Sequence, residues 1–92
     1  MSGDVAAEIR RRLAGLAPLR LELVDESALH AGHAGAAPGG NTHWRLSLTS
    51  AAFTGQGTVA RHRMVYAALG DLMRAPIHAL ALTTRAPGEA GD

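Results

Sequence analysis

Hydrophobic and polar positions alternate along the chain with two different periods, and the order of these periods predicts its elements. Residues 4–16 repeat apolar side chains at helical spacing, which predicts an amphipathic helix with Asp4 as its N-cap. The chain from Leu19 to Asp25 alternates with a period of two, as expected of a strand with one buried face. The first helix and the first strand therefore precede the centre of the chain.

The centre, residues 42–84, has the pattern of a strand, a helix and a strand. His43 to Ser50 alternates with a period of two, a helix with Thr58 as its N-cap follows, and Ile77 to Thr84 is apolar in its middle. A strand, a helix and a strand joined by short connectors form a right-handed crossover, so the two strands should be parallel neighbours. Their first residues then lie at the same edge of the sheet.

Two segments lack any periodicity. Residues 26–42 form a loop rich in Gly, and its length favours a role in binding because connections of this length without structure of their own are usually either functional or disordered. The ends of the chain, residues 1–3 and 85–92, are expected to be flexible and disordered. The remaining residues, 4–84, form one domain, since 92 residues leave no room for a second core.

Composition excludes several classes of function. The net charge of +1 gives no long-range attraction for nucleic acid or for an anionic membrane. No apolar run approaches the roughly 18 residues of a membrane helix, and no leader opens the chain, so we expect a cytoplasmic protein without a membrane partner. The absence of Cys excludes a thiol nucleophile and a thiolate metal site from this chain alone. No catalytic motif is present, which disfavours an enzyme.

Histidines are the candidate metal ligands. His43 begins the second strand and His78 stands near the start of the third, so in parallel neighbours about 4.8 Å apart their imidazoles could converge on one ion. Histidines at strand starts are commonly surface residues, and spacing alone leaves both interpretations open. His30 and His33 are weaker candidates because a flexible loop is a poor pre-organised site. His62, beside the apolar stripe of the second helix, is expected to be a structural, hydrogen-bonded histidine.

Several motifs together resemble the signature of the BolA family. They occur in order between about residues 5 and 84: Asp25-Glu26-Ser27 with His30, Thr42-His43-Trp44, Phe53-Thr54-Gly55, Arg61-His62-Arg63-Met64-Val65-Tyr66-Ala67-Ala68-Leu69, and Ile77-His78-Ala79-Leu80-Ala81-Leu82. The resemblance implies an α+β domain of the class II KH-like type with the order αββαβ. In that fold a three-stranded mixed sheet carries its helices on one face, in agreement with the elements predicted above.

The resemblance also implies a function. Members of this family are non-catalytic partners of monothiol glutaredoxins with a Cys-Gly-Phe-Ser motif, and the heterodimer shares a [2Fe-2S] cluster in iron-sulfur trafficking and iron regulation. His78 corresponds to the C-terminal histidine ligand of the family, and His43 to a ligand that is His or Cys in different branches. The glutaredoxin cysteine and glutathione would supply the sulfur ligands, so this chain would hold no cluster alone. The free form is expected to be a monomer or a weak homodimer.

Imidazole ligands should make the stability of the shared cluster depend on pH. Imidazole binds a metal only when it is neutral, and it is displaced by protons at milder acidity than a thiolate. We therefore expect a transferable cluster that is lost as the pH falls from about 8 to about 5.5.

The alternative function is a KH-like nucleic-acid-binding transcriptional regulator. KH domains clamp single strands with a Gly-x-x-Gly loop beside a basic surface. The Gly55-Gln56-Gly57 segment does not have that spacing, and all nine basic residues are Arg. A small patch for DNA could still form from exposed arginines. The candidates are Arg63, Arg74 and Arg45.

Four of the other arginines are expected to bind no nucleic acid or phosphate. Arg10, Arg11 and Arg12 are consecutive, so they spread around the first helix and should form a solvated face. Arg61, at the first turn of the second helix, should bind backbone carbonyls in place of a phosphate.

Overall fold

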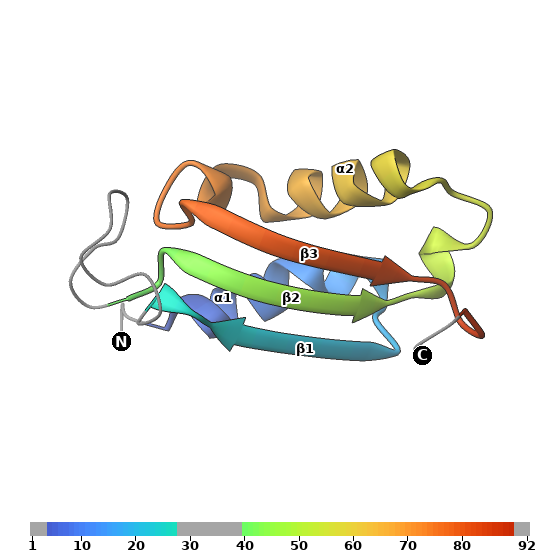
Figure 1. The fold of residues 1–92 in the computed structure, drawn as a ribbon, viewed down its shortest axis with the longest axis horizontal. Coiled ribbons are helices and arrows are strands. Elements are labelled where there is room, and N and C mark those ends of the chain that lie inside the picture. Colours follow the sequence, from blue (N-terminus) through green and yellow to red (C-terminus); the bar gives the residue numbers. More distant parts are fainter. Residues whose placement is uncertain (1–3, 28–39, 90–92) are drawn as a thin grey trace.

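The computed structural model describes residues 4–27 and 40–89, and it shows the predicted αββαβ order (Figure 1). The expectations for residues 1–3 and 90–92, and those for His30 and His33, lie outside the described residues. The helices and strands are α1 (Val5–Leu13), β1 (Arg20–Asp25), β2 (His43–Thr49), α2 (Thr58–Leu69) and β3 (Ala79–Arg85).

The three strands form one mixed sheet in the order β1-β2-β3. β1 is antiparallel to β2, and β2 is parallel to β3, as the crossover predicted. The register pairs Trp44 of β2 with both Asp25 and Leu80, so β2 and β3 start side by side at the edge where β1 ends. Both helices lie on one face of the sheet and leave the other face uncovered (Figure 1).

The core lies between the helices and the covered face of the sheet. α1 contributes Ile9 and Leu13 to it, and the connector after β2 contributes Phe53, which is fully buried. The buried apolar residues are Ile9, Leu13, Trp44, Leu46, Leu48, Phe53, Val65, Leu69, Leu72, Ile77 and Ala86. None of the helices in residues 4–27 and 40–89 is both long enough and apolar enough to cross a membrane.

Several element boundaries differ from the sequence-based prediction by one to three residues. Asp4 is the N-cap of α1 as predicted, and its Oδ1 accepts a hydrogen bond of 2.9 Å from the Ala7 N–H. Thr58 is the first helical residue of α2, and the extended Gly57 is the N-cap. α1 ends at Leu13 and continues as a short 3-10 helix. β3 begins after His78, so this histidine stands just outside the strand.

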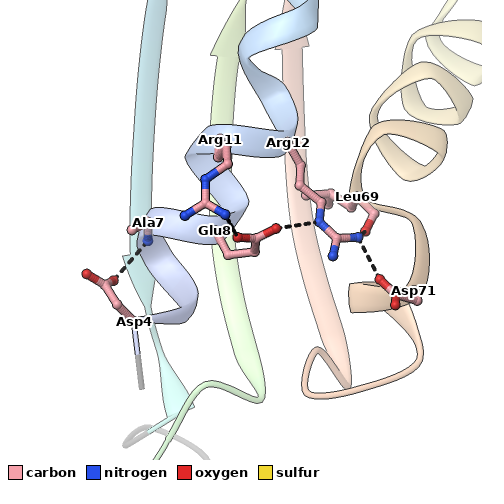
Figure 2. Close-up of polar contacts among 7 residues, drawn as sticks. All are labelled: Asp4, Ala7, Glu8, Arg11, Arg12, Leu69 and Asp71. Atoms are coloured by element: carbon pink, nitrogen blue, oxygen red, sulfur yellow. Dashed lines mark hydrogen bonds and ion pairs between the residues drawn. The ribbon is translucent and has the colours of Figure 1, made fainter. Parts of the chain in front are cut away.

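Arg12 ties the two helices together, as Figure 2 shows. Its Nη1 donates to the Leu69 carbonyl (2.9 Å) and to Asp71 Oδ1 (2.6 Å), and its Nε donates to Glu8 (2.9 Å). Arg11 pairs with the same glutamate. Hydrogen bonds from Arg12 are the main reason why the pKa values of Glu8 and Asp71 lie below their ordinary values. The predicted solvated face is therefore wrong for Arg12, because its guanidinium joins residues that are distant in the chain.

The chain after β3 is held against the start of α2. Arg61 donates two hydrogen bonds of 2.7 Å to the carboxylate of Glu89 and one of 2.8 Å to the Gln56 carbonyl. The ion pair, helped by the Ala86 N–H, lowers the pKa of Glu89 to about 2. Arg61 thus binds a backbone carbonyl as predicted. β3 extends to Arg85, the first residue of the expected tail, and this ion pair holds Glu89 against the start of α2.

Candidate metal-binding edge

His43 and His78 lie side by side at the edge of the sheet where β2 and β3 start. The Thr42 carbonyl accepts hydrogen bonds from the N–H groups of His78 (2.7 Å) and Ala79 (3.0 Å), which fixes the two strand starts together. The ring centroids of the two histidines are 5.5 Å apart, and their planes are tilted by 53°. The parallel pairing therefore brings these imidazoles together, as the sequence predicted.

This spacing fits two ligands of one metal ion. A tetrahedral ion about 2.1 Å from one nitrogen of each ring would hold the two centroids roughly 5 Å apart. No cluster of three or more His, Cys, Asp or Glu residues suited to a metal occurs in residues 4–27 and 40–89. The two histidines therefore provide two of the four ligands that a tetrahedral metal ion takes.

The two histidines differ in their surroundings. His43 is buried, with a relative exposure of 8 %, whereas His78 is exposed. The Nδ1 of His43 lies 2.9 Å from the Thr42 hydroxyl. When Nδ1 carries the proton and donates to this hydroxyl, Nε2 keeps its lone pair for a metal. His43 is thus held in one orientation, while the His78 ring stands where another molecule can reach it.

A hydrogen-bond network closes the loop beside these histidines. Asp25, the last residue of β1, accepts from the hydroxyl (2.6 Å) and the N–H (2.9 Å) of Ser27 and from the Asn41 N–H (3.1 Å). Burial raises the pKa of Asp25, but the three donors, together with the nearby His43, bring it below its ordinary value. The Ser27 hydroxyl accepts in turn from the N–H groups of Thr42 (2.9 Å) and His43 (3.1 Å).

This network was not predicted from the sequence, where Asp25 and Ser27 stand only within a family motif. The run of polar residues directly after a half-buried strand could have indicated a hydrogen-bonded turn. What the pattern could not show is that Ser27 is buried and that its partners lie on the far side of the loop. These contacts depend on the antiparallel register of β1 and β2.

An open depression of about 330 Å³ adjoins His43 at this edge. Its rim includes Glu26, which pairs with Arg45 through a hydrogen bond of 2.7 Å. The depression is lined by Glu26, His43, Trp44, Ala79, Leu80 and Ala81. A partner that approached the histidines would therefore also meet apolar surface.

The remaining candidates lie elsewhere. The His62 ring is half-buried and contacts Tyr66 edge to face, with centroids 6.3 Å apart. Its predicted hydrogen bond is not found among the described residues. Arg45 lies on the uncovered face of the sheet, whereas the exposed Arg63 and Arg74 belong to α2 and the turn after it. The three arginines therefore do not gather into one patch.

Comparison with known proteins identifies the family. A family model described as BolA-like protein matches residues 13–89. The chain belongs to the BolA-like family. The family predicted from the sequence motifs is thereby confirmed.

Individual BolA-like proteins agree with this assignment. BolA-like protein 1 of Homo sapiens is 42 % identical over 88 residues, which cover 95 % of this chain and 61 % of that protein. The DNA-binding transcriptional regulator BolA of Escherichia coli (strain K12) is 41 % identical over 71 residues, which cover 77 % of this chain and 64 % of that protein. The chain spans between 61 % and 64 % of the BolA-like proteins 1 that it matches in Pongo abelii, Homo sapiens and Bos taurus.

A solved structure confirms the fold. The BolA domain of SufE1 from Arabidopsis thaliana superposes with a TM-score of 0.82 at 38 % sequence identity. The match covers 95 % of this chain and 96 % of that domain. The α+β fold with a three-stranded mixed sheet is therefore that of a BolA domain.

Proposed function

We propose that this BolA-like chain is a non-catalytic partner of a monothiol glutaredoxin with a Cys-Gly-Phe-Ser motif. The heterodimer would share a [2Fe-2S] cluster and serve iron-sulfur trafficking or iron regulation. The observation that supports this proposal is the pair of histidine rings, 5.5 Å apart, at one edge of a chain without Cys. The identity of the partner follows from the family resemblance.

The donor set suits a shared cluster. Iron-sulfur clusters are normally held by thiolates, and two His replace two Cys on one iron where the potential is raised. His78 and His43 would bind one iron, and a glutaredoxin cysteine with glutathione would supply sulfur to the other. In this arrangement His78 meets the partner first because its ring is exposed, and the Thr42 hydroxyl orients His43.

The test is co-expression with such a glutaredoxin, followed by visible absorption and circular dichroism of the purified complex. We expect His78→Ala and His43→Ala to remove or alter the cluster spectrum. His62→Ala is the matched control, because this histidine lies on α2 away from the edge. A heterodimer whose cluster spectrum is indifferent to both edge substitutions would contradict the proposal.

The loop histidines belong in the same experiment. His30→Ala and His33→Ala test the two weaker candidates, which precede β2 in the chain. Loss of the spectrum in one of these variants, with His43→Ala unchanged, would move the second ligand from His43 to the loop. Light scattering of the free chain, which we expect to be a monomer or a weak homodimer, shows whether the heterodimer replaces a self-association.

The second candidate is a KH-like nucleic-acid-binding regulator. The name of the Escherichia coli relative favours it, at 41 % identity. Exposed Arg63 and Arg74 would contact phosphates, whereas Arg45 is already paired with Glu26. A gel shift with single-stranded DNA at physiological ionic strength tests this function. Arg63→Gln with Arg74→Gln should weaken binding and reduce the salt slope by about 1.4, and Arg45→Gln is the control.

A further inference from the structure

One carboxylate holds both ends of the loop between β1 and β2. Asp25 Oδ1 accepts from Ser27 at the beginning of the loop, and Oδ2 accepts from the Asn41 N–H at its end. Gly40 fits this arrangement because it has a φ of +83°, and a Cβ atom there would lie 3.0 Å from Asp25 Oδ2. The backbone at the end of the loop therefore packs directly against the carboxylate.

Ser27 carries this constraint to β2. A serine hydroxyl has one proton and two lone pairs. Here the proton goes to Asp25, and the lone pairs accept the N–H groups of Thr42 and His43. The residue is 6 % exposed, so water cannot replace these partners. The position of the Ser27 oxygen therefore fixes the backbone at the start of β2.

The same backbone is bonded to His78. The Thr42 carbonyl accepts from the His78 N–H (2.7 Å), so Asp25, Ser27, Thr42 and His78 form a continuous series of hydrogen bonds. The His43 N–H also donates to the Ser27 hydroxyl, and the His43 ring lies 5.5 Å from the His78 ring. The series thus sets how His43 meets His78.

We propose that Asp25 and Ser27 are positioning residues for metal binding at this edge. Neither residue contacts His78 or would bind the metal ion. They act by holding the two ends of the loop, at Ser27 and Asn41, against the start of β3. Groups behind the ligands of metal sites commonly act in this way, and their loss weakens metal affinity. The proposal rests on the proposed function, but its test does not need a glutaredoxin or a cluster.

Asp25→Asn is the selective variant. The amide keeps one oxygen for Ser27 but points an NH₂ group at the Asn41 N–H, so it releases the end of the loop alone. Glu22→Gln is the matched control, a carboxylate-to-amide change on the same strand at a solvent-exposed position. Thermal unfolding of each free protein shows that the variants are folded.

The probe is Zn²⁺ titrated into the free protein, followed by calorimetry and by ¹⁵N NMR of the histidine rings. In the wild type we expect Zn²⁺ to shift the ring nitrogens of His78 and His43. Asp25→Asn should raise the Kd for Zn²⁺ on the order of tenfold, and Glu22→Gln should leave it within about twofold. Equal Kd values for wild type and Asp25→Asn, or no Zn²⁺ binding by the wild type, would overturn the proposal.

Ser27 provides the second arm. Ser27→Ala should weaken Zn²⁺ binding at least as much as Asp25→Asn, and Ser27→Thr, which keeps the hydroxyl, should restore it. Failure of Ser27→Thr to bind better than a folded Ser27→Ala would overturn the role of the hydroxyl. If these Zn²⁺ results hold and no cluster forms with the glutaredoxin, the proposed function fails while the positioning role stands.

Discussion

The two ends of the sheet use similar polar groups with different results. At the far end, where β2 and β3 finish, Ser50 is fully buried and bonds the Leu16 carbonyl and the Ala52 N–H, and Arg61 pairs with Glu89. At the histidine end, where β2 and β3 start, Asp25 and Ser27 also satisfy one another. Beside them, however, His78 is exposed at the start of β3, an end of the sheet that Figure 1 shows opposite the far end.

The two ends differ in whether their polar side chains are paired within the described part of the chain. The charged Arg61 at the far end has its donors taken by residues of the same chain. The ring of His78 makes no hydrogen bond or ion pair with any residue in 4–27 or 40–89, although its backbone is firmly bonded to Thr42. A rigid backbone with an available side chain is what a metal ligand shared with a partner requires.

Serine-to-alanine substitutions at the two ends should have the largest effects on stability. Ser27→Ala leaves the N–H groups of Thr42 and His43 buried without an acceptor, which should cost about 3 kcal/mol in unfolding free energy. Ser50→Ala should cost about 2 kcal/mol, because the Leu16 carbonyl and the Ala52 N–H both lose their partner. Urea unfolding measures both losses. Only Ser27→Ala should also change Zn²⁺ binding; an equal change in Ser50→Ala would show that the ends are not independent.

Two glycines in left-handed backbone offer a finer comparison. Gly88 at the far end has a φ of +85° and open space around it, so Gly88→Ala should cost about 1 kcal/mol from backbone strain alone. Gly40 has nearly the same φ, but its Cβ would press on Asp25, so Gly40→Ala should cost about 2 kcal/mol or more. Denaturation of the two variants gives the difference, and equal losses would mean that the loop end is not packed against Asp25.

The Arg61 and Glu89 pair should give a smaller, pH-dependent effect. Because the pKa of Glu89 is lowered from 4.5 to about 2, its contribution to stability is complete above pH 4.5 and is lost as the pH falls towards about 2. Glu89→Gln should therefore unfold at a lower temperature than the wild type at neutral pH. This difference in unfolding temperature should be small even at neutral pH, because the pair is partly exposed. It should disappear as the pH falls through this acidic range. A difference that is independent of pH would contradict the assignment.

His78→Ala should have the smallest effect on stability. The ring is exposed, so its removal should change the unfolding free energy by less than about 0.5 kcal/mol. Urea unfolding of His78→Ala and Ser27→Ala in parallel distinguishes a side chain that binds a metal from one that stabilises the fold. A loss as large as that of Ser27→Ala would assign a structural role to the ring.

Expectations failed where a side chain reaches far along the chain. Arg12 bonds to Leu69 and Asp71, more than 50 residues away, and Arg61 bonds to Glu89 across 28 residues. Helical periodicity describes neighbours within one element, so it placed Arg12 in solvent and left residues 85–89 without a partner. Only the packing of α1 on α2, and of the chain end on the start of α2, creates these ion pairs.

The sequence by itself determined the αββαβ order, the parallel pairing of β2 with β3 and the shared edge of His43 and His78. These features follow from hydrophobic periods and from the handedness of the crossover, which are properties of local segments. Only the tertiary structure decided that His43 is buried against Thr42 while His78 is exposed. It also decided that Asp25 and Ser27 close the loop, because such contacts depend on strand register and on the direction of single side chains.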